Sequence, residues 1–120
     1  MASVLIVDDA EFMQMTIQRM LDANGHSVAG FAANGIEAVK MYPEVKPDVV
    51  ILDITMPEMN GIEALKRIKV LDPDARIIIC SAIGLQDKIA EAIECGAEEF
   101  IVKPFEAEYL IGAIEKVMRK

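Results

Sequence analysis

The sequence has few of the residues that mark several common classes of protein. It contains two cysteines, one histidine and no tryptophan in 120 residues. Cys80 and Cys95 give no disulfide framework, and no Cys-x-x-Cys pair or zinc-ligand spacing is present. We expect Cys80 to be buried because it lies within an apolar run, and we expect a reduced, cytoplasmic setting. His26 stands at the start of an expected strand, so we do not expect histidine-based catalysis.

The sequence also lacks long apolar stretches and an excess of basic residues. Its wholly apolar runs are far shorter than the roughly 20 residues needed to cross a membrane, so we expect no membrane insertion. No basic start followed by an apolar region appears at the N-terminus, so no secretory signal is expected. The net charge of −8, from 12 basic and 20 acidic residues, argues against nucleic-acid binding by this chain. Such a charge suits basic protein partners, or is simply a solvated acidic surface.

What the sequence does contain is a regular alternation of short apolar runs and amphipathic segments. The runs lie at 3–7, about 27–32, 48–52, 76–80 and 99–102, and apolar residues recur every three or four positions between them. Short, continuous, β-branched runs are typical of strands buried on both faces of a parallel sheet. Because right-handed crossovers place helices on both faces of such a sheet, the pattern predicts a doubly wound α/β fold with five βα units. The length and the hydrophobic fraction of 53% fit one domain, 1–120.

Glycine, asparagine and proline mark the expected ends of the helices. Asn-Gly pairs begin at positions 24, 34 and 60, and their flanks have helical periodicity, so we expect helix caps and loop turns rather than hairpins. We expect Pro43 to stop the second helix and Gly96 to cap the fourth, which we expect to include Ala97. Pro57 and Asn60-Gly61 are expected to fix the path of the long loop after the third strand.

Polar residues follow four of the five expected strands. Asp8 and Asp9 follow the first, Asp53 the third, Ser81 the fourth and Lys103 the fifth. Ligands of open α/β sheets bind beyond the carboxyl ends of the strands, so these side chains should meet at one edge. Clustered carboxylates repel one another unless a cation joins them, and Mg²⁺ prefers oxygen ligands. The sequence therefore predicts a magnesium site beside a lysine, which indicates phosphoryl chemistry.

Each of these residues also has a purely structural interpretation. Asp53 could be a nucleophile that forms an aspartyl phosphate, or a loop or capping residue. Asp8 and Asp9 could supply one direct and one water-mediated metal ligand, or cap the following helix. Lys103 could pair with a phosphoryl oxygen or be a surface lysine, and Ser81 could bind a phosphoryl oxygen or cap a helix. Their occurrence together at one edge favours the site.

Other phosphate chemistries fit the sequence less well. It has no Gly-x-x-x-x-Gly-Lys-Ser/Thr loop, and no Gly-x-Gly-x-x-Gly follows the first strand. A magnesium-dependent phosphatase or phosphomutase with an aspartyl nucleophile is an alternative. Such enzymes usually carry a second aspartate two residues after the nucleophile, where this sequence has Thr55.

Four segments together resemble the receiver domain of two-component response regulators. The resemblance covers the whole chain, and among stand-alone receivers the sequence is most similar to CheY-like chemotaxis regulators. Since the chain ends with the fifth helix, we expect no output domain after it. The segments are Leu5-Ile6-Val7-Asp8-Asp9, Leu52-Asp53-Ile54-Thr55-Met56-Pro57-Glu58-Met59-Asn60-Gly61, Ser81-Ala82 and Val102-Lys103-Pro104-Phe105.

The resemblance implies a fold and a set of pocket residues. The fold would be a flavodoxin-like sheet with strand order 2-1-3-4-5. Asp53 would accept a phosphoryl group from the phosphohistidine of a CheA-like histidine kinase. Asp9, Asp53 and the backbone carbonyl of Thr55 would bind Mg²⁺ directly, with Asp8 assisting. The chain would catalyse only its own phosphorylation and dephosphorylation.

The resemblance also implies a switch. Ser81 and Lys103 would contact the phosphoryl group and couple it to a change of state, and Phe100 stands at the position of the switch aromatic. A downstream target, such as a motor or switch component, would read residues 86–95, 100–102 and 106–118. The chain is expected to be a monomer. A phosphorelay carrier, which passes its phosphoryl group to another histidine protein, would use the same pocket and is the main alternative.

Overall fold

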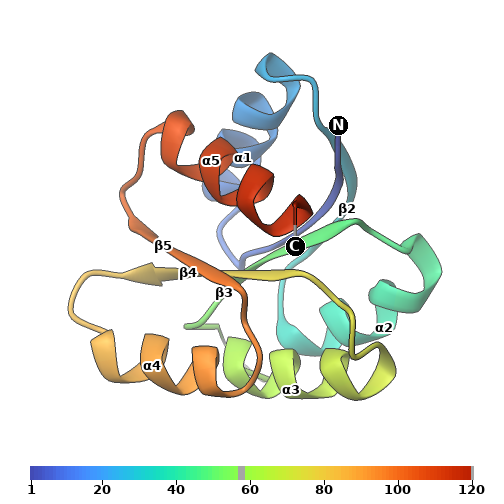
Figure 1. Cartoon of the computed structure of the whole chain (residues 1–120), viewed down its shortest axis with the longest axis vertical. Helices are drawn as coiled ribbons and strands as arrows, with labels where there is room; N and C mark the ends of the chain where they lie inside the picture. The colour runs from blue at the N-terminus through green and yellow to red at the C-terminus, as the bar shows by residue number, and fades with distance from the viewer. Residues whose placement is uncertain (57–58, 120) are drawn as a thin grey trace.

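The computed structural model describes residues 1–56 and 59–119. It confirms the predicted fold, with five parallel strands in the order β2-β1-β3-β4-β5 and the ten elements alternating along the chain (Figure 1). Pro57, which we expected to direct the long loop, and Glu58 of the same motif lie outside the described residues. The elements are β1 Ser3–Val7, α1 Glu11–Ala23, β2 Ser27–Ala32, α2 Gly35–Val45, β3 Val49–Asp53, α3 Gly61–Leu71, β4 Ile77–Ala82, α4 Gln86–Glu94, β5 Glu99–Lys103 and α5 Ala107–Met118.

The parallel register aligns the carboxyl ends of four strands. Val7 of β1 pairs with Leu52 of β3, and Asp53 pairs with Cys80 of β4. At the end of the next pair of strands, Ala82 of β4 pairs with Lys103 of β5. The residues that follow these strands therefore emerge side by side at one edge of the sheet, as the sequence predicted.

The sheet separates two apolar clusters. Helices α1 and α5 cover one face, and α2, α3 and α4 cover the other (Figure 1). Because successive side chains of a strand point to opposite faces, Val4 and Ile6 pack in the first cluster while Leu5 and Val7 pack in the second. All five residues of β3 are buried, so the middle strand is the most buried strand of the sheet. None of the helices in the described part of the chain is both long and apolar enough to cross a membrane.

The expectation that the fifth strand is buried on both faces is wrong. Of the residues in β5 only Ile101 is buried, and Phe100 is 43% exposed. β5 lies at the edge of the sheet, where only β4 pairs with it, so one side of the strand meets no other strand.

Pro43 does not stop the second helix, contrary to our expectation. It lies inside α2, which continues to Val45 and is closed by Lys46 in a left-handed conformation, with the Lys46 N–H donating to the Tyr42 carbonyl. Pro43 lies in the last turn of α2, where its missing N–H removes one helical hydrogen bond, and the helix is still closed by the hydrogen bond from Lys46 to Tyr42. The hydroxyl of that buried side chain donates to Asp72 Oδ2 at 2.8 Å.

The Asn-Gly pairs do cap helices. Asn34 and Asn60 are the N-caps of α2 and α3, and each side chain accepts from the backbone N–H three residues later. Gly96 has a φ of +112° after α4, as a left-handed cap requires. Ala97 lies beyond that cap and not in the helix, because the glycine has already turned the chain toward β5.

Candidate functional site

Three carboxylates converge at the carboxyl edge of the sheet. Asp8 and Asp9 follow β1 and Asp53 ends β3, and one oxygen of each lies within 4.8 Å of the others. Asp8 and Asp53 are buried, with 1% and 6% of their surface exposed, whereas Asp9 is exposed. Three close carboxylate oxygens, one of them open to solvent, are a donor set that suits a hard divalent cation.

Lys103 reaches this cluster from the edge strand. Its Nζ lies 2.8 Å from Asp8 Oδ2 and 3.4 Å from Asp53 Oδ2, so its side chain crosses in front of β4. The interpretation of Lys103 as an ordinary surface lysine is therefore wrong. One ammonium faces three carboxylates, which leaves the cluster with an excess of negative charge.

Asp8 is fully engaged by neighbouring groups. Its Oδ1 accepts the Ala10 N–H at 2.9 Å, its Oδ2 accepts from Lys103, and its backbone carbonyl accepts from the Gln14 side chain at 2.8 Å. Helix α1 has Ala10 as its N-cap and no side-chain cap, so neither aspartate caps it as the structural alternative proposed. The sequence analysis missed Gln14, which carries no signal beyond being a polar residue early in a helix.

Asp53 is a buried carboxylate with opposing influences on its pKa. Burial raises the pKa, and the nearby charge of Asp8 raises it further. The ammonium of Lys103 and the Thr55 backbone N–H, which donates to Asp53 Oδ1 at 3.1 Å, lower it. The net shift is upward, so the ionised form of Asp53 is disfavoured in the folded protein as it stands.

Two other groups at this edge respond to the same charges. Burial alone would lower the pKa of Lys103, but the hydrogen bond to Asp8 and the charges of Asp53 and Asp8 outweigh burial and raise it. Lys103 therefore stays a cation. Cys80, which is buried in β4 as expected, has its pKa raised to about 12, chiefly by burial, and stays a neutral thiol.

Ser81 lies in β4 beside the acidic cluster. It is completely buried, and its hydroxyl donates to the Ala82 carbonyl at 3.0 Å. The structural alternative, a loop serine that caps the next helix, is wrong because the N-cap of α4 is Leu85, and this helix has no side-chain cap.

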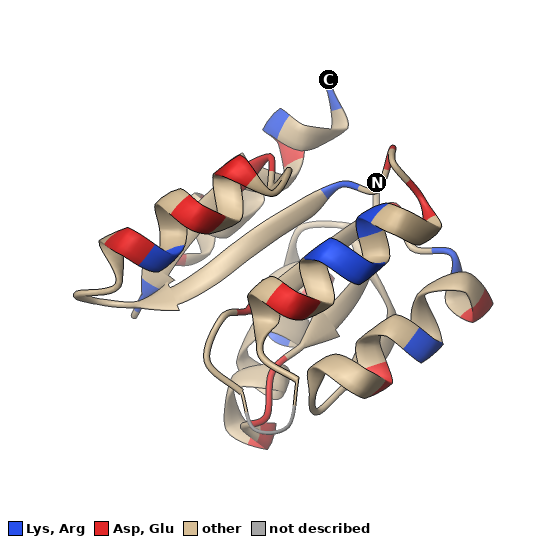
Figure 2. Ribbon diagram, turned by 90° about the horizontal axis from the view of Figure 1, so that it is seen from below, with Lys and Arg blue, Asp and Glu red and all other residues tan. Residues whose placement is uncertain are grey.

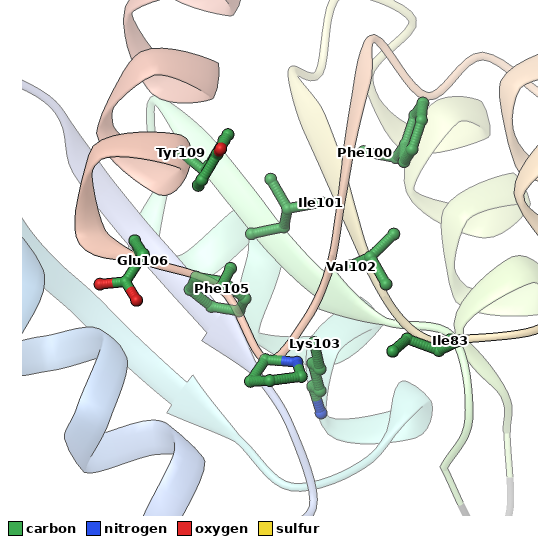
Figure 3. Close-up of a pocket in the computed structure, with 9 residues that line it drawn as sticks. Ile83, Phe100, Ile101, Val102, Lys103, Phe105, Glu106 and Tyr109 are labelled. Atoms are coloured by element: carbon green, nitrogen blue, oxygen red, sulfur yellow. The ribbon is translucent and has the colours of Figure 1, made fainter.

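Phe100 lies away from the acidic cluster, on the outer part of β5. It lines a surface hollow of about 400 Å³ together with Ile83, Tyr109 and the stem of Lys103. Figure 3 shows Phe100 and Tyr109 on opposite sides of β5, with Lys103 near the end of the strand. Ile83, Phe100 and Tyr109 are all exposed, so the hollow is apolar and open to solvent.

Comparison of the sequence with models of protein families identifies the family of this chain. The model described as "Response regulator receiver domain" matches residues 4–115. The chain belongs to the response regulator receiver family. Receiver domains bind Mg²⁺ at an acidic pocket and act in general as switches without enzymatic turnover, and the cluster of Asp8, Asp9 and Asp53 corresponds to such a pocket.

Individual receivers are similar to this chain over nearly its whole length. Chemotaxis protein CheY of Thermotoga maritima is 54% identical over 116 residues, 97% of each chain. Sporulation initiation phosphotransferase F of Bacillus subtilis is 37% identical over 96% of this chain and 92% of its own. A chain in the crystal structure of the CheX–CheY–BeF3–Mg²⁺ complex from Borrelia burgdorferi is 37% identical, with a TM-score of 0.93, covering 98% of this chain and 90% of that one. The chain is thus a response regulator receiver with chemotaxis homologues at about 50% identity.

Proposed function

We propose that Asp53 is the phosphoacceptor of a chemotaxis response regulator. A carboxylate oxygen of Asp53 would attack the phosphorus of a phosphohistidine on a CheA-like kinase, and the phosphorus–nitrogen bond would break as the imidazole leaves. The observation that carries the proposal is the position of Asp53, at the end of the most buried strand, with Lys103 Nζ 3.4 Å away and two more carboxylates beside it.

The acidic residues would divide the work of holding Mg²⁺. Asp9 and Asp53 would be direct ligands with the backbone carbonyl of Thr55. Asp8 would act indirectly, because both of its carboxylate oxygens already accept hydrogen bonds from Ala10 and Lys103. The ion would supply positive charge that offsets both the carboxylates and the incoming phosphoryl oxygens.

Lys103 and Ser81 would report the presence of the phosphoryl group. A phosphoryl oxygen on Asp53 would compete with Asp8 for the Lys103 ammonium, and the Ser81 hydroxyl would exchange its bond to the Ala82 carbonyl for one to the phosphoryl group. Lys103 lies in the same strand as Phe100, and Ser81 lies in the neighbouring strand β4. Inward rotation of Phe100 would mark the active state. Phosphorylation would then shift a two-state equilibrium.

The surface formed by α4, β5 and α5 would bind the downstream target, a motor or switch component. It presents the exposed apolar hollow around Phe100 and Tyr109. Helix α4 carries three acidic residues and one lysine, while the neighbouring α3 carries three basic residues and one glutamate (Figure 2). A partner with apolar anchors and basic flanks would therefore favour the α4 side.

The same proposal covers the remaining expectations. Residues 1–120 would act as one receiver domain, monomeric and cytoplasmic, and would turn over only its own phosphoryl group. A phosphorelay role is the second candidate, because the chain is 37% identical to a sporulation phosphotransferase. The higher identity to a chemotaxis protein, 54%, places the switch first. A phosphatase or phosphomutase is disfavoured because Thr55 stands where a second acid would be needed.

Phosphorylation of the isolated chain tests the proposal. With Mg²⁺ and a small acyl phosphate donor, the wild-type protein should gain one hydroxylamine-labile phosphoryl group by intact mass. Asp53→Asn should gain none. Asp74→Asn is the matched control, because Asp74 is exposed in the turn between α3 and β4, and it should behave as wild type. A phosphoryl group on Asp53→Asn at the wild-type rate would show that another residue is the acceptor.

A further inference from the structure

The loop between β3 and α3 is fastened to a helix from a different βα unit. The backbone N–H of Gly35, the first residue of α2, donates to the Met59 carbonyl at 3.1 Å. Gly35 is buried, and it lies 18 residues before Asp53 in the sequence. The contact therefore joins the loop that follows the proposed phosphoacceptor to an element that contributes no residue to the acidic cluster.

Glycine is required at position 35 because a side chain would not fit there, and not because of the backbone angles. Gly35 is not among the glycines with a positive φ, so any residue could adopt its backbone angles. A Cβ at position 35 would lie 2.4 Å from the Met59 carbonyl oxygen and 2.8 Å from Met59 Cβ. Both separations are shorter than real Cβ contacts, and one of the two atoms belongs to the backbone, so either the loop or the helix would have to move.

The helix is the less movable of the two. The Asn34 side chain accepts from the Glu37 N–H at 2.8 Å, and the Glu37 side chain accepts from the Ala33 N–H at 2.8 Å, which is a reciprocal cap. Behind the cap, Ala38 and Tyr42 are buried in the apolar cluster under the sheet. A side chain at position 35 would therefore displace the loop.

The other end of the same loop is held as closely. The Gly61 N–H donates to the Ile54 carbonyl at 2.8 Å, and a Cβ at position 61 would lie 2.2 Å from the Asp53 carbonyl oxygen. Met59 is two residues from Gly61, which lies directly against the backbone of Asp53 and Ile54. A displacement at Met59 would therefore be passed through Asn60 and Gly61 to the backbone next to Asp53.

We propose that Gly35 is a positioning residue for the magnesium site, acting through Met59 on the loop that carries Thr55. This inference rests on the proposed function, because the Thr55 carbonyl is proposed as a ligand. Groups that orient metal ligands without touching the metal typically contribute 10–100-fold to metal affinity. Gly35→Ala should therefore weaken Mg²⁺ binding by about tenfold or more while the protein stays folded.

Titration calorimetry with Mg²⁺ tests the inference, using Gly112→Ala as the matched control. Gly112 lies in α5, where an added Cβ meets nothing within 4 Å, so this variant should bind Mg²⁺ as wild type does. A folded Gly35→Ala protein with wild-type Mg²⁺ affinity would overturn the inference and leave the proposed function intact. Absence of Mg²⁺ binding by the wild-type protein would overturn both.

A second measurement uses only the wild-type protein, so it tests the inference even if Gly35→Ala does not fold. Coupling between two interactions is reciprocal, so Mg²⁺ should strengthen the Gly35–Met59 contact as much as the contact strengthens Mg²⁺ binding. Hydrogen exchange of the Gly35 amide in the wild-type protein should slow by about tenfold when Mg²⁺ is added. An unchanged exchange rate, with Mg²⁺ binding established by calorimetry, would overturn the inference.

Discussion

The amino and carboxyl ends of the parallel strands, which form two edges of the sheet, differ in how their charged side chains are paired. At the amino edge of β4, Lys69 Nζ lies 3.0 Å from Glu98 Oε2 and donates to the Ala75 carbonyl at 2.6 Å. The second oxygen of Glu98 accepts the Ile77 N–H at 2.9 Å. Here the Lys69 ammonium pairs with the Glu98 carboxylate, and backbone groups of Ala75 and Ile77 join the same network.

At the carboxyl edge, carboxylates outnumber cations. One ammonium, from Lys103, faces the carboxylates of Asp8, Asp9 and Asp53. The paired charges at the amino edge connect α3, β4 and the start of β5. Under the proposed function, the excess of carboxylates at the carboxyl edge would be offset by Mg²⁺ and would let the state of this edge change on phosphorylation.

The largest effect should come from making the carboxyl edge less acidic. Asp9→Ala removes the one exposed carboxylate of the cluster, so Mg²⁺ affinity should fall by about 100-fold, the upper end of what loss of a group that supports a metal ligand costs. Asp74→Ala, near the opposite edge, should leave Mg²⁺ affinity unchanged. Calorimetric titration measures both, and equal affinities for Asp9→Ala and wild type would exclude the proposed ligand set.

Substitution of Lys69 should change stability, whereas substitution of Lys103 should change signalling. Lys69→Ala leaves Glu98 and the Ala75 carbonyl without this donor, so the free energy of unfolding should fall by about 1–3 kcal/mol with no change in phosphorylation. Lys103→Ala should still be phosphorylated and should still bind Mg²⁺. It should lose most of the gain in partner affinity that phosphorylation produces, a coupling commonly worth about 1–3 kcal/mol.

Urea unfolding and partner binding with and without the phosphoryl group distinguish these outcomes. Full enhancement of partner binding in Lys103→Ala would mean that Lys103 only neutralises charge, and that Ser81 and Phe100 carry the switch.

The smallest effect is a change in the pH dependence of stability. The pKa of Asp53 is raised in the folded state, so ionisation of Asp53 opposes folding. This cost is absent below the unfolded pKa of 3.8, grows as the pH rises toward the raised folded value, and is complete above it. In chelator, Asp53→Asn should therefore be more stable than wild type at pH 7, and the gain should disappear as the pH falls below the unfolded pKa. Thermal unfolding across this range tests the sign, and a less stable variant at pH 7 would contradict it.

Much of the fold and of the site follows from residues that act locally. Runs such as Val49–Leu52 predict buried strands because their side chains suit no other environment, and the parallel order then brings Asp8, Asp53 and Lys103 to one edge. The convergence of these residues was predicted, and their individual roles stay predictions.

What the sequence could not reveal depends on contacts between distant segments. Gln14 matters only because the Asp8 carbonyl lies within its reach, and Gly35 only because Met59 packs against it. The exposure of Phe100 follows from the place of β5 at the edge, which is a property of strand order and not of the strand itself. Pro43 was misjudged because α2 continues to Val45 and is closed by Lys46 in a left-handed conformation, which the sequence does not signal.

The long reach of Lys103 has a consequence for how fast the protein can respond. Its side chain begins in the outermost strand and ends on β1 and β3, so it spans the sheet above the apolar core. Under the proposed function, phosphorylation of Asp53 would be passed to β5 by rotation about single bonds of the Lys103 side chain. Side-chain rotations and small loop movements take nanoseconds to microseconds, so this step would be fast. The delay would lie in making and removing the phosphoryl group.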